Sequence, residues 1–365
     1  MKLFEGLRIG LIGPLAPPAG GMANQTQQLA ELLLAEQASV VMVQTNRPYF
    51  PAMAGRIPGL RALFRLMPYL LALWRAAGKV DLFHLMANSG WAWHLFSMPA
   101  IWIAYARGVP VVVNYRGGEA EKFLERSHAL VRWSMRHAAA LAVPSGFLEQ
   151  IFRRHGMHPV VVPNVIDLAR FHPREAAVPP GPPGRHIVVA RNLEPLYDNA
   201  TALRAFAGIR QRFADATLTI AGSGPEAAGL QQLAVELGVR DAVHFVGRLD
   251  RERMADLYRR CDICLNPSLA DNMPNSLLEA MASGLPVVST AVGGVPFMVS
   301  EGVTALLVPA GDPRAMADGV IKLFEDVALW RRLATAGLSE VQRYTWPRVA
   351  PALGEVYRRA TTGRA

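Results

Sequence analysis

Cysteine is nearly absent from this chain, which contains only Cys261 and Cys264 among its 365 residues. Two cysteines cannot form a disulfide framework, and without a second pair a zinc site is not expected either. The two residues stand in an apolar run, CDIC, that is typical of a strand. A reactive C-x-x-C pair begins a helix, which lowers the thiol pKa, so we expect inert thiols here.

Long apolar runs are missing as well. No window reaches the roughly 18–20 uninterrupted apolar residues that a membrane-spanning helix needs. Residues 1–15 are a glycine-interrupted apolar run without a small-residue cleavage site, which favours a first strand over a signal peptide. We therefore expect a cytoplasmic protein.

Acidic residues are in the minority, 29 against 38 basic ones, and the net charge of +9 comes almost wholly from arginine. Such a balance favours anionic partners: nucleotide diphosphates, lipid headgroups or nucleic acid. The basic residues are scattered or mixed with aliphatic ones and form no base-stacking platform, so we expect no nucleic-acid partner. With 51% hydrophobic and 18% charged residues, the chain should be globular.

Short β-rich runs alternate with helical patterns along almost the whole chain. Two series of six strands are predicted: 7–12, 40–44, 82–86, 109–114, 140–143 and 160–162, then 187–190, 217–221, 243–246, 263–266, 287–290 and 305–308. Each series predicts a doubly wound parallel sheet, so the fold class is α/β with two Rossmann-like domains.

The domain boundary is predicted from composition. Residues 173–185 contain Pro179, Pro180, Pro182 and Pro183 and little that can be buried, which is typical of a linker. We therefore predict an amino-terminal domain over 1–172 and a second domain over 186–338. The amphipathic segment 339–365 is a candidate to pack back on the first domain.

Two glycine-rich turns each follow a predicted strand. In the first, Gly20 and Gly21 precede a helix whose amino end favours an anion, although a plain strand-to-helix turn is the alternative. The dinucleotide spacing G-x-G-x-x-G is lacking, which argues against a nicotinamide or flavin cofactor. The second turn, AGSGP, contains Gly222 and Gly224.

The most informative segments follow later strands of the second half. In HFVGR, Val246 and Gly247 end a strand at the sheet edge where open α/β folds bind ligands. In 266–290, Asp271 lies in a loop and Glu279, eight residues on, in a helix that starts near Asn275 and Ser276. Helix-start N–H groups suit a diphosphate, and carboxylates suit sugar hydroxyls. The alternative is an ordinary loop with Asn275 as helix cap.

These motifs resemble the nucleotide-binding half of the retaining family 4 glycosyltransferases. The matching features are the arginine after the first strand, AGSGP, HFVGR, the D-x7-E segment, EAMASGLPVV and VGGVP, all within 187–311. The first half matches more loosely, through GGM at 20–22, PS at 144–145 and PNVID at 163–167. The resemblance implies the GT-B fold, in which two Rossmann-like domains face each other across a cleft that holds the donor.

The resemblance also implies roles for single residues. Glu279 would hold the ribose hydroxyls, Asp271, where the family usually has Glu, would contact the donor sugar, and Arg191 would clamp the diphosphate. The family's lysine a few residues after Arg191 is missing, and Arg248 or Arg116 could compensate for it. We predict Arg191, Asp271 and Arg116 to be catalytic. The residues predicted to bind the donor are Gly20, Gly21, Gly222, Gly224, Val246, Gly247, Asn275, Ser276 and Glu279.

In the family that the sequence resembles, a His-Gly turn often closes the strand that corresponds to 109–114. Arg116 stands at this place in the present sequence. A guanidinium is always charged near neutral pH, so it cannot act as a base but can stabilise a leaving group or bind an acceptor phosphate. Glu119 could orient it, or could simply begin the next helix.

The expected activity is retaining transfer from a nucleotide-diphosphate sugar to a glycan or lipid-linked acceptor, in cell-surface polysaccharide or glycolipid synthesis. No acidic D-x-D segment is present, so we expect no metal ion and no cofactor besides the donor. The alternatives are a non-catalytic nucleotide-sugar-binding or membrane scaffold protein and a nucleotide-sugar epimerase or phosphorylase of similar fold.

Residues 56–79 contain five basic residues and no acidic one, mixed with Leu, Phe, Met, Tyr and Trp. Basic amphipathic segments of this kind bind anionic membrane surfaces, which would place the protein on the inner face of the membrane. The alternative is a helix packed on the first sheet with an exposed arginine edge. A second apolar stretch, 91–105, is expected to be a buried helix rather than an anchor.

Overall fold

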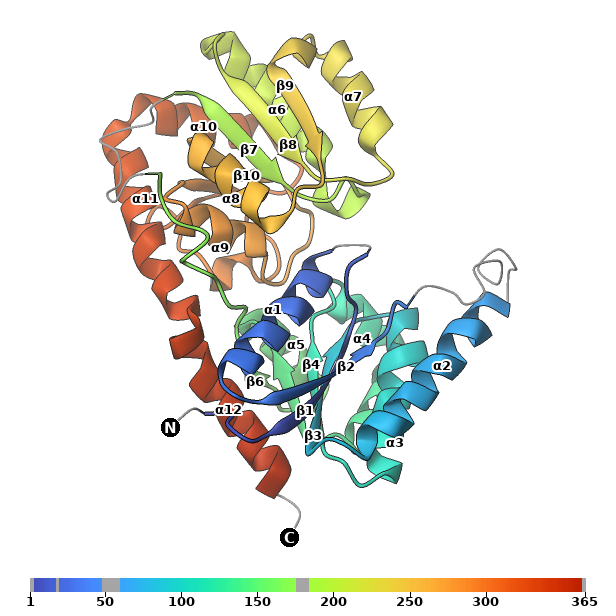
Figure 1. The fold of residues 1–365 in the computed structure, drawn as a ribbon. Helices are drawn as coiled ribbons and strands as arrows, with labels where there is room; N and C mark the ends of the chain where they lie inside the picture. Colours follow the sequence, from blue (N-terminus) through green and yellow to red (C-terminus); the bar gives the residue numbers. More distant parts are fainter. Residues whose placement is uncertain (1–2, 18–19, 48–59, 175–183, 363–365) are drawn as a thin grey trace. The chain divides into compact units, whose positions relative to one another are not determined.

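The computed structural model of the chain describes residues 3–17, 20–47, 60–174 and 184–362. The chain divides into two compact units (Figure 1). Unit 1 combines residues 1–164 with residues 347–365, and unit 2 is residues 165–346. Each unit contains one six-stranded parallel sheet.

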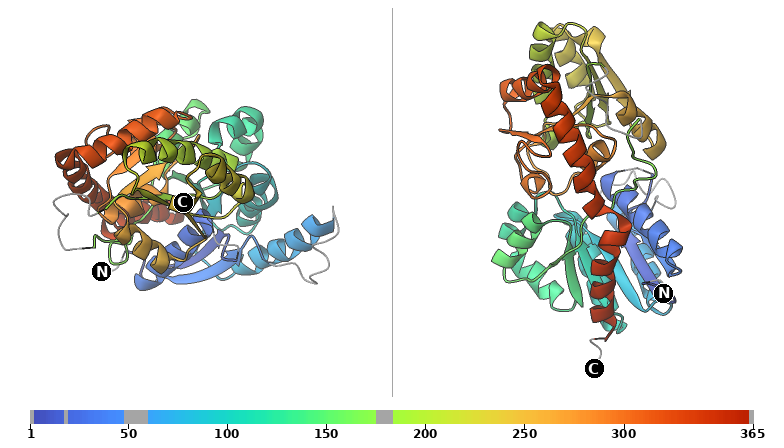
Figure 2. Two further views of the ribbon diagram at one scale, coloured as in Figure 1. Left: turned by 90° about the horizontal axis from the view of Figure 1, so that it is seen from above. Right: turned by 90° about the vertical axis from the view of Figure 1, so that its left-hand side faces the viewer.

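Unit 1 has the strand order β2-β1-β3-β4-β5-β6, with helices on both faces of the sheet (Figure 2). Its elements are β1 (Arg8–Gly13), α1 (Gly21–Ala35), β2 (Ser39–Gln44), α2 (Leu60–Ala77), β3 (Leu82–Ala87), the π-helix η2 (Trp93–Ser97), α3 (Met98–Ala106), β4 (Val111–Tyr115), α4 (Ala120–Met135), β5 (Ala140–Val143), α5 (Gly146–Arg154), β6 (Val160–Val161) and α12 (Trp346–Thr362). Successive strands are added on opposite sides of β1, so the order reverses between β1 and β3. Open α/β sheets bind ligands outside the carboxyl ends of the strands at such a switch point.

Unit 2 repeats this architecture with the order β12-β11-β10-β7-β8-β9. Its elements are β7 (His186–Ala190), η3 (Pro195–Tyr197), α6 (Asn199–Arg212), β8 (Thr217–Ala221), α7 (Ala227–Glu236), η4 (Arg240–Ala242), β9 (Val243–Gly247), α8 (Arg251–Arg260), β10 (Ile263–Asn266), α9 (Asn275–Ala282), β11 (Val287–Thr290), η5 (Val295–Phe297), β12 (Leu306–Val308), α10 (Pro313–Glu325), α11 (Val327–Glu340) and η6 (Val341–Tyr344). Here the order reverses between β7 and β10.

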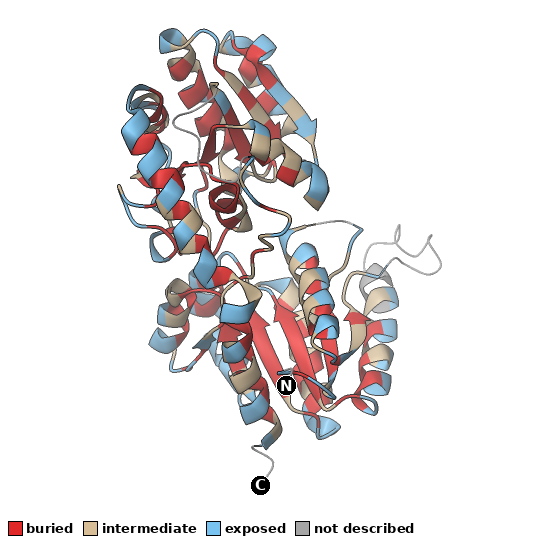
Figure 3. Cartoon of the chain, turned by 60° about the vertical axis from the view of Figure 1, so that its left-hand side comes forward, coloured by how far each residue is buried: buried red, intermediate tan, exposed pale blue. Residues whose placement is uncertain are grey.

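The central strands form the core of each unit. Every residue of β3, β4, β10 and β11 is buried, whereas the covering helices alternate buried and exposed positions (Figure 3). All twelve predicted strands are found within about two residues of their predicted bounds. The central strands are covered on both faces, and such strands are short continuous apolar runs that a sequence shows plainly.

The passage between the units differs from the predicted linker at 173–185. The chain leaves unit 1 after Asn164, and the segment that follows packs in unit 2. The backbone N–H of Ile166 donates to the carbonyl of Tyr344 at 2.9 Å. Phe171 is buried with its ring 6.1 Å from that of Tyr258. Residues 175–183, with the four prolines, lie outside the described residues.

The carboxy-terminal segment belongs to unit 1 from residue 347, not from 339, because α11 and η6 pack in unit 2. Within unit 1, Tyr357 of α12 is buried and its ring packs edge-on against Phe4, with centroids 5.6 Å apart. The Tyr357 hydroxyl is hydrogen-bonded to Nδ1 of His84 at 2.8 Å. The final helix is therefore part of the core of unit 1.

None of the described helices combines the length and apolar character needed to cross a bilayer. The apolar stretch 91–105, expected to be buried, is only partly so. Trp93 and Ile101 are buried, but Trp91 is 78% exposed and Tyr105 is 58% exposed. Both exposed rings lie at ends of the helical segment, Trp91 at its first residue and Tyr105 in the last turn of α3.

Candidate active site

Polar side chains meet at the switch point of the second sheet, where β7 and β10 end side by side. Arg191 follows β7, and its Nε donates to Oδ1 of Asn266, the last residue of β10, at 2.8 Å. The guanidinium also forms an ion pair with Asp271, which lies in the loop between β10 and α9. Asn266 itself is fixed, because its Nδ2 donates to Ser289 Oγ at 2.9 Å. This places a cation at the edge where a ligand is expected.

Arg191 and Asp271 form a largely desolvated pair, with side chains only 10% and 12% exposed. Burial raises the pKa of Asp271 above its ordinary value, while the Arg191 guanidinium and the N–H of Asn272 act in the opposite direction. The carbonyl of Asp271 accepts the N–H of Gly294 at 2.8 Å. A Cβ on Gly294 would lie 1.7 Å from the Asn272 carbonyl oxygen, so this loop requires glycine there.

Glu279 lies in α9 and faces α8. The hydroxyl of Tyr258 donates to Oε2 of Glu279 at 3.3 Å and lies 3.3 Å from the carbonyl oxygen of Ser276. Burial raises the pKa of Glu279, and the charges of Arg251 and Arg191 together with the Tyr258 hydroxyl oppose this shift. The carboxylate is thus oriented by a buried tyrosine and lies within the field of Arg191.

The start of α9 has the geometry predicted for it. Pro274 is the N-cap residue and provides no side-chain cap, and the first turn of the helix contains no acidic residue. Asn275 and Ser276 are the first two helical residues, so Asn275 is not the helix cap that the alternative interpretation required. A helix amino end whose first turn contains no acidic residue is favourable for an anion.

The glycines of the AGSGP and HFVGR motifs shape the backbone behind Arg191. A Cβ on Gly222 would lie 1.8 Å from the Arg191 carbonyl oxygen, and one on Gly224 would lie 2.2 Å from that of Leu193. The N–H of Gly222 donates to the carbonyl of Gly247 at 2.8 Å. Val246, the next-to-last residue of β9, has an exposed side chain. Gly222 and Gly224 are therefore needed for contact within the chain, whatever they contribute to a ligand.

In unit 1, Arg116 follows β4 and is held by amide oxygens. Its Nη1 donates to Oε1 of Gln25 in α1 at 2.6 Å and to Oδ1 of Asn164. Burial lowers the pKa of Arg116 to about 10, so the group remains charged near neutral pH. Glu119 does not orient it: Glu119 is the N-cap residue of α4 and pairs with Lys122 at 3.0 Å.

Gly20 and Gly21 stand at the start of α1, after β1. Gly20 has extended backbone, and a Cβ on either glycine would meet nothing within 4 Å. Neither residue is required by contacts within the described chain, unlike Gly222 and Gly224. Open space above a helix start is compatible with the predicted approach of a ligand.

Three further predictions concern Arg248, a metal ion and the cysteines. Arg248, a proposed substitute for the missing lysine, is exposed, and no ion pair of it is recorded in the described part of the chain. Among the described residues no three His, Cys, Asp or Glu side chains gather as metal ligands. Cys264 is buried in β10, and burial raises its pKa to about 12, which fits the inert thiol that was predicted.

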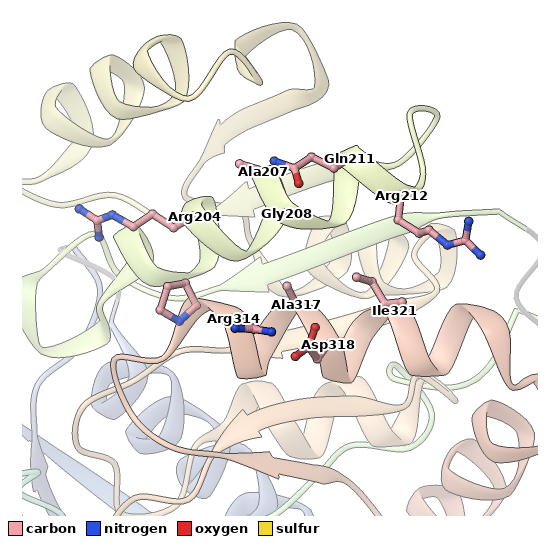
Figure 4. A pocket seen from close by; sticks show the side chains of 10 residues that line it. Arg204, Ala207, Gly208, Gln211, Arg212, Arg314, Ala317, Asp318 and Ile321 are labelled. Atoms are coloured by element: carbon pink, nitrogen blue, oxygen red, sulfur yellow. The ribbon is translucent and has the colours of Figure 1, made fainter.

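An open groove of about 640 Å³ runs between α6 and α10 of unit 2 (Figure 4). Gly208 and Ala317 lie at the close approach of the two helices, where a Cβ on Gly208 would be 3.6 Å from that of Ala317. Arg204, Arg212 and Arg314 are among its lining residues. None of the predicted site residues lines this groove, so it is separate from the cluster around Arg191.

Sequence reasoning missed the residues that hold the predicted ones. Asn266 orients Arg191, Tyr258 orients Glu279, and Gln25 with Asn164 holds Arg116. A polar residue ending an apolar strand, as in ICLN, is a signal that could have found Asn266. Tyr258 carries no such signal, because its contact with Glu279 comes from the packing of α8 on α9.

Comparison with known proteins identifies similar chains. Residues 184–326 match the family model described as glycosyl transferases group 1, and residues 19–170 match that of Glycosyltransferase Family 4. A phosphatidyl-myo-inositol mannosyltransferase of Mycobacterium leprae is 27% identical over 379 residues, which cover 98% of each chain. A D-inositol 3-phosphate glycosyltransferase of Salinispora arenicola is 30% identical over 311 residues, 78% of this chain and 69% of that protein.

A shorter match involves a D-inositol 3-phosphate glycosyltransferase of Saccharomonospora viridis, 31% identical over 233 residues; it spans 58% of this chain and 53% of that protein. Among solved structures, a sucrose-phosphate synthase from Thermosynechococcus elongatus aligns over 98% of this chain and 100% of its own length. The TM-score is 0.78 and the sequence identity 22%.

Proposed function

The chain belongs to glycosyltransferase family 4, and we propose that it is a retaining, metal-independent transferase that moves a sugar from a nucleotide-diphosphate donor to a glycan or lipid-linked acceptor. Its two units, each with a six-stranded parallel sheet, have the GT-B fold that the sequence predicted. The observation that carries the proposal is the cluster of Arg191, Asp271 and Glu279 at the switch point of unit 2.

Unit 2 binds the donor in this proposal. The diphosphate takes a position at Arg191 and the amino end of α9, because a guanidinium and a helix amino end both favour an anion. Glu279, oriented by Tyr258, accepts hydrogen bonds from the ribose hydroxyls. Asp271 contacts the donor sugar and shares the guanidinium of Arg191 with the diphosphate. No further cofactor is needed.

The proposed chemistry is front-face transfer. The bond between the anomeric carbon and the β-phosphate oxygen breaks, and the acceptor oxygen forms its new bond to the same face of that carbon. The acceptor proton passes to the departing phosphate oxygen, so no protein base is needed. Arg191 stabilises the charge that develops on the leaving diphosphate, and one such preorganised group is worth about 10²–10³ in rate.

The residue to change is therefore Arg191. Arg191→Ala should lower kcat at least about a hundredfold with the fold intact by circular dichroism, because it removes the cation opposite the leaving group. The assay is sugar transfer and donor hydrolysis with UDP-, GDP- and ADP-sugars, after a thermal-shift screen that identifies the donor. Arg210→Ala, which alters an arginine of α6 outside the cluster, is the control. Near-normal turnover in Arg191→Ala would remove this residue from the mechanism.

The acceptor would bind unit 1, at Arg116. A buried cation held by two amides, Gln25 and Asn164, suits a phosphate group on the acceptor. The curated names of the relatives refer to inositol 3-phosphate and phosphatidyl-myo-inositol, which are phosphorylated cyclitols. This makes a phosphate-bearing saturated ring our first candidate for the acceptor, and glycolipid or cell-surface polysaccharide synthesis the process.

A cytoplasmic, peripheral position on an anionic membrane completes the proposal. Four large apolar side chains follow one face of α2 with helical spacing and are 39% to 57% exposed: Phe64, Met67, Leu71 and Trp74. We call this set the α2 stripe. Arg107 lies over the ring of Trp74 at 4.7 Å, and Arg75 lies in the last turn of the helix. Exposed apolar residues beside cations suit an anionic bilayer surface. Residues 56–59 of the predicted basic segment lie outside the described residues.

Liposome flotation tests this position. The full chain should bind vesicles of phosphatidylglycerol and phosphatidylcholine at low salt and bind pure phosphatidylcholine more weakly. Met67→Glu combined with Leu71→Glu should abolish binding, because two carboxylates would face the lipid. Val235→Glu, at a 56% exposed apolar residue of α7 in unit 2, is the matched control and should bind like the wild type. Undiminished binding of the double variant would exclude the α2 stripe.

A further inference from the structure

The most exposed large hydrophobic side chain in the described part of the chain is Trp91, at 78%. It is the first helical residue after the turn 88–90 that follows β3, and β3 with β1 forms the switch point of the first sheet. That edge is where an open α/β sheet binds its ligand. A single exposed apolar residue needs no explanation on an ordinary surface, but this one occupies the ligand-binding edge of its unit.

The turn 88–90, which leads into Trp91, lies directly against the Arg116 turn. The N–H of Arg116 donates to the carbonyl of Ala87, the last residue of β3, at 2.9 Å. A Cβ on Gly117 would lie 2.6 Å from Oγ and 2.8 Å from the backbone N of Ser89. The two turns are therefore in backbone contact, and residue 117 must be small for this contact to exist.

The indole of Trp91 is supported from behind while it remains open to solvent. Its ring stands edge-on to His94, with centroids 6.2 Å apart, and His94 stands edge-on to Phe123 of α4 at 5.9 Å. His94 belongs to the π-helix η2, a rare element that is frequent at functional sites. This row of rings ends in the core of unit 1, because Phe123 packs against buried Trp93. The indole is a supported aromatic platform and not a loosely attached side chain.

Saturated rings bind such platforms through their C–H face, by dispersion and by attraction to the negative face of the aromatic ring. We propose that Trp91 stacks against the saturated ring of the acceptor, a sugar or cyclitol, while Arg116 holds a phosphate on that ring. This inference rests on the proposed function for the reaction, but it assigns acceptor recognition to a residue outside the family motifs. Trp91 then decides which acceptor is used and takes no part in bond breaking.

Binding is tested first, independently of turnover. D-inositol 3-phosphate, glucose 6-phosphate and mannose 6-phosphate are titrated into the full chain with UDP present, and tryptophan fluorescence is recorded. At least one probe should change the signal in the wild type, and Trp91→Phe should lose that change while still binding the probe by calorimetry. Failure of all three to bind, or an identical signal in Trp91→Phe, would overturn the inference.

Kinetics with the bound probe as acceptor separate the inference from the proposed function. Trp91→Ala should raise the acceptor KM about tenfold or more with kcat and donor KM within about twofold, the pattern of lost substrate binding. Trp91→Phe should restore most of the affinity, whereas Tyr105→Ala, an exposed ring at the far end of α3, should match the wild type. An unchanged acceptor KM in Trp91→Ala refutes the platform and leaves the transferase standing. A probe that binds through Trp91 but is never glycosylated refutes the transferase and leaves the platform standing.

Discussion

Arg191 is the central residue of the proposed donor site, and its position depends on two neighbours. Asn266 accepts a hydrogen bond from Nε of the guanidinium, and Asp271 forms an ion pair with Nη2 that balances its charge. A pair that is only about one-tenth exposed has lost most of its hydration. An incoming diphosphate would supply a second anion to the same cation, so ligand binding and the stability of the pair are coupled.

Asp271→Asn tests this coupling. Without the diphosphate, the variant should be less stable by roughly 3 kcal/mol, because removing one partner leaves a nearly buried charge uncompensated. Saturating UDP should recover much of that loss, since its diphosphate pairs with Arg191. Urea unfolding with and without UDP measures both quantities. Equal losses in the two conditions would mean that UDP does not reach Arg191.

His84 gives unit 1 a stability that depends on pH. Burial and the charge of Arg116 lower its pKa from 6.5 to about 3 in the folded protein. Above pH 6.5 the residue is neutral in both states and has no effect. Between these two values the unfolded chain binds a proton that the folded chain does not, so stability falls as the pH falls, by about 1.4 kcal/mol per unit.

The check is urea unfolding of the wild type and His84→Asn at pH 7.0 and pH 5.0. A pH of 5.0 is 1.5 units below the pKa of 6.5 that His84 has in the unfolded chain. The free energy of unfolding of the wild type should therefore fall by about 2 kcal/mol more than that of the variant between pH 7.0 and pH 5.0. The comparison removes the contributions of Asp271 and Glu279, whose raised pKa values have the opposite effect and are common to both proteins. Parallel losses would show that His84 is protonated in the folded state.

At the scale of elements, the turns after the strands carry the candidate site residues, and their glycines differ in what surrounds them. Gly222 allows the turn after β8 to touch the backbone of Arg191, whereas Gly20 stands in open space at the start of α1. The sequence predicted donor contact for both residues alike. Only the structure separates a glycine that the chain itself needs from one that nothing in the described chain requires.

Gly222→Ala should therefore destabilise unit 2 by about 1–3 kcal/mol, because its Cβ would overlap the Arg191 carbonyl oxygen and the backbone would have to shift. Gly229→Ala, in α7 where a Cβ meets nothing, is the control and should stabilise by up to about 1 kcal/mol. Thermal unfolding measures both. A Gly222→Ala protein as stable as the wild type would mean that the turn after β8 relaxes freely.

The strands could be predicted almost residue by residue, because a parallel strand buried on both faces is a continuous apolar run such as VVVNY or ICLN. The side-chain contacts that hold the candidate site residues in place could not be predicted from the sequence. Tyr258 and Glu279 are brought together by the packing of two helices, and Arg116 and Gln25 by the order of strands in the sheet. Such contacts depend on topology, which leaves no local pattern in the sequence.

The division into units was harder to predict. A proline-rich stretch indicates a segment that cannot pack, but it does not indicate at which residue the chain stops packing in unit 1 and begins to pack in unit 2. Ile166 and Phe171 fall within the predicted first domain, 1–172, but both are buried among residues of unit 2. The change at 346/347 falls after the first residue of α12, where the helical pattern of the sequence continues without a break.

Removal of residues 347–365 should therefore damage unit 1 and spare most of unit 2. The deletion uncovers the surface that Val349, Leu353 and Tyr357 bury, and it takes away the partner of His84. Hydrogen exchange followed by mass spectrometry should show faster exchange in β1 and β3, with β10 and β11 still protected. Equal protection in both sheets would mean that α12 contributes little to the stability of unit 1. Tyr357→Phe, which keeps the ring, should show only a small effect.

The place of α12 also bears on how the polypeptide reaches its native state during translation. The first sheet leaves the ribosome early, but the helix that covers it is made after the whole of unit 2. Domains generally fold in order from the amino terminus as they emerge, and an uncovered apolar surface is prone to aggregate. The first sheet of this chain is complete before unit 2 is made, so the nascent chain exposes the apolar surface that α12 will cover during the whole synthesis of unit 2.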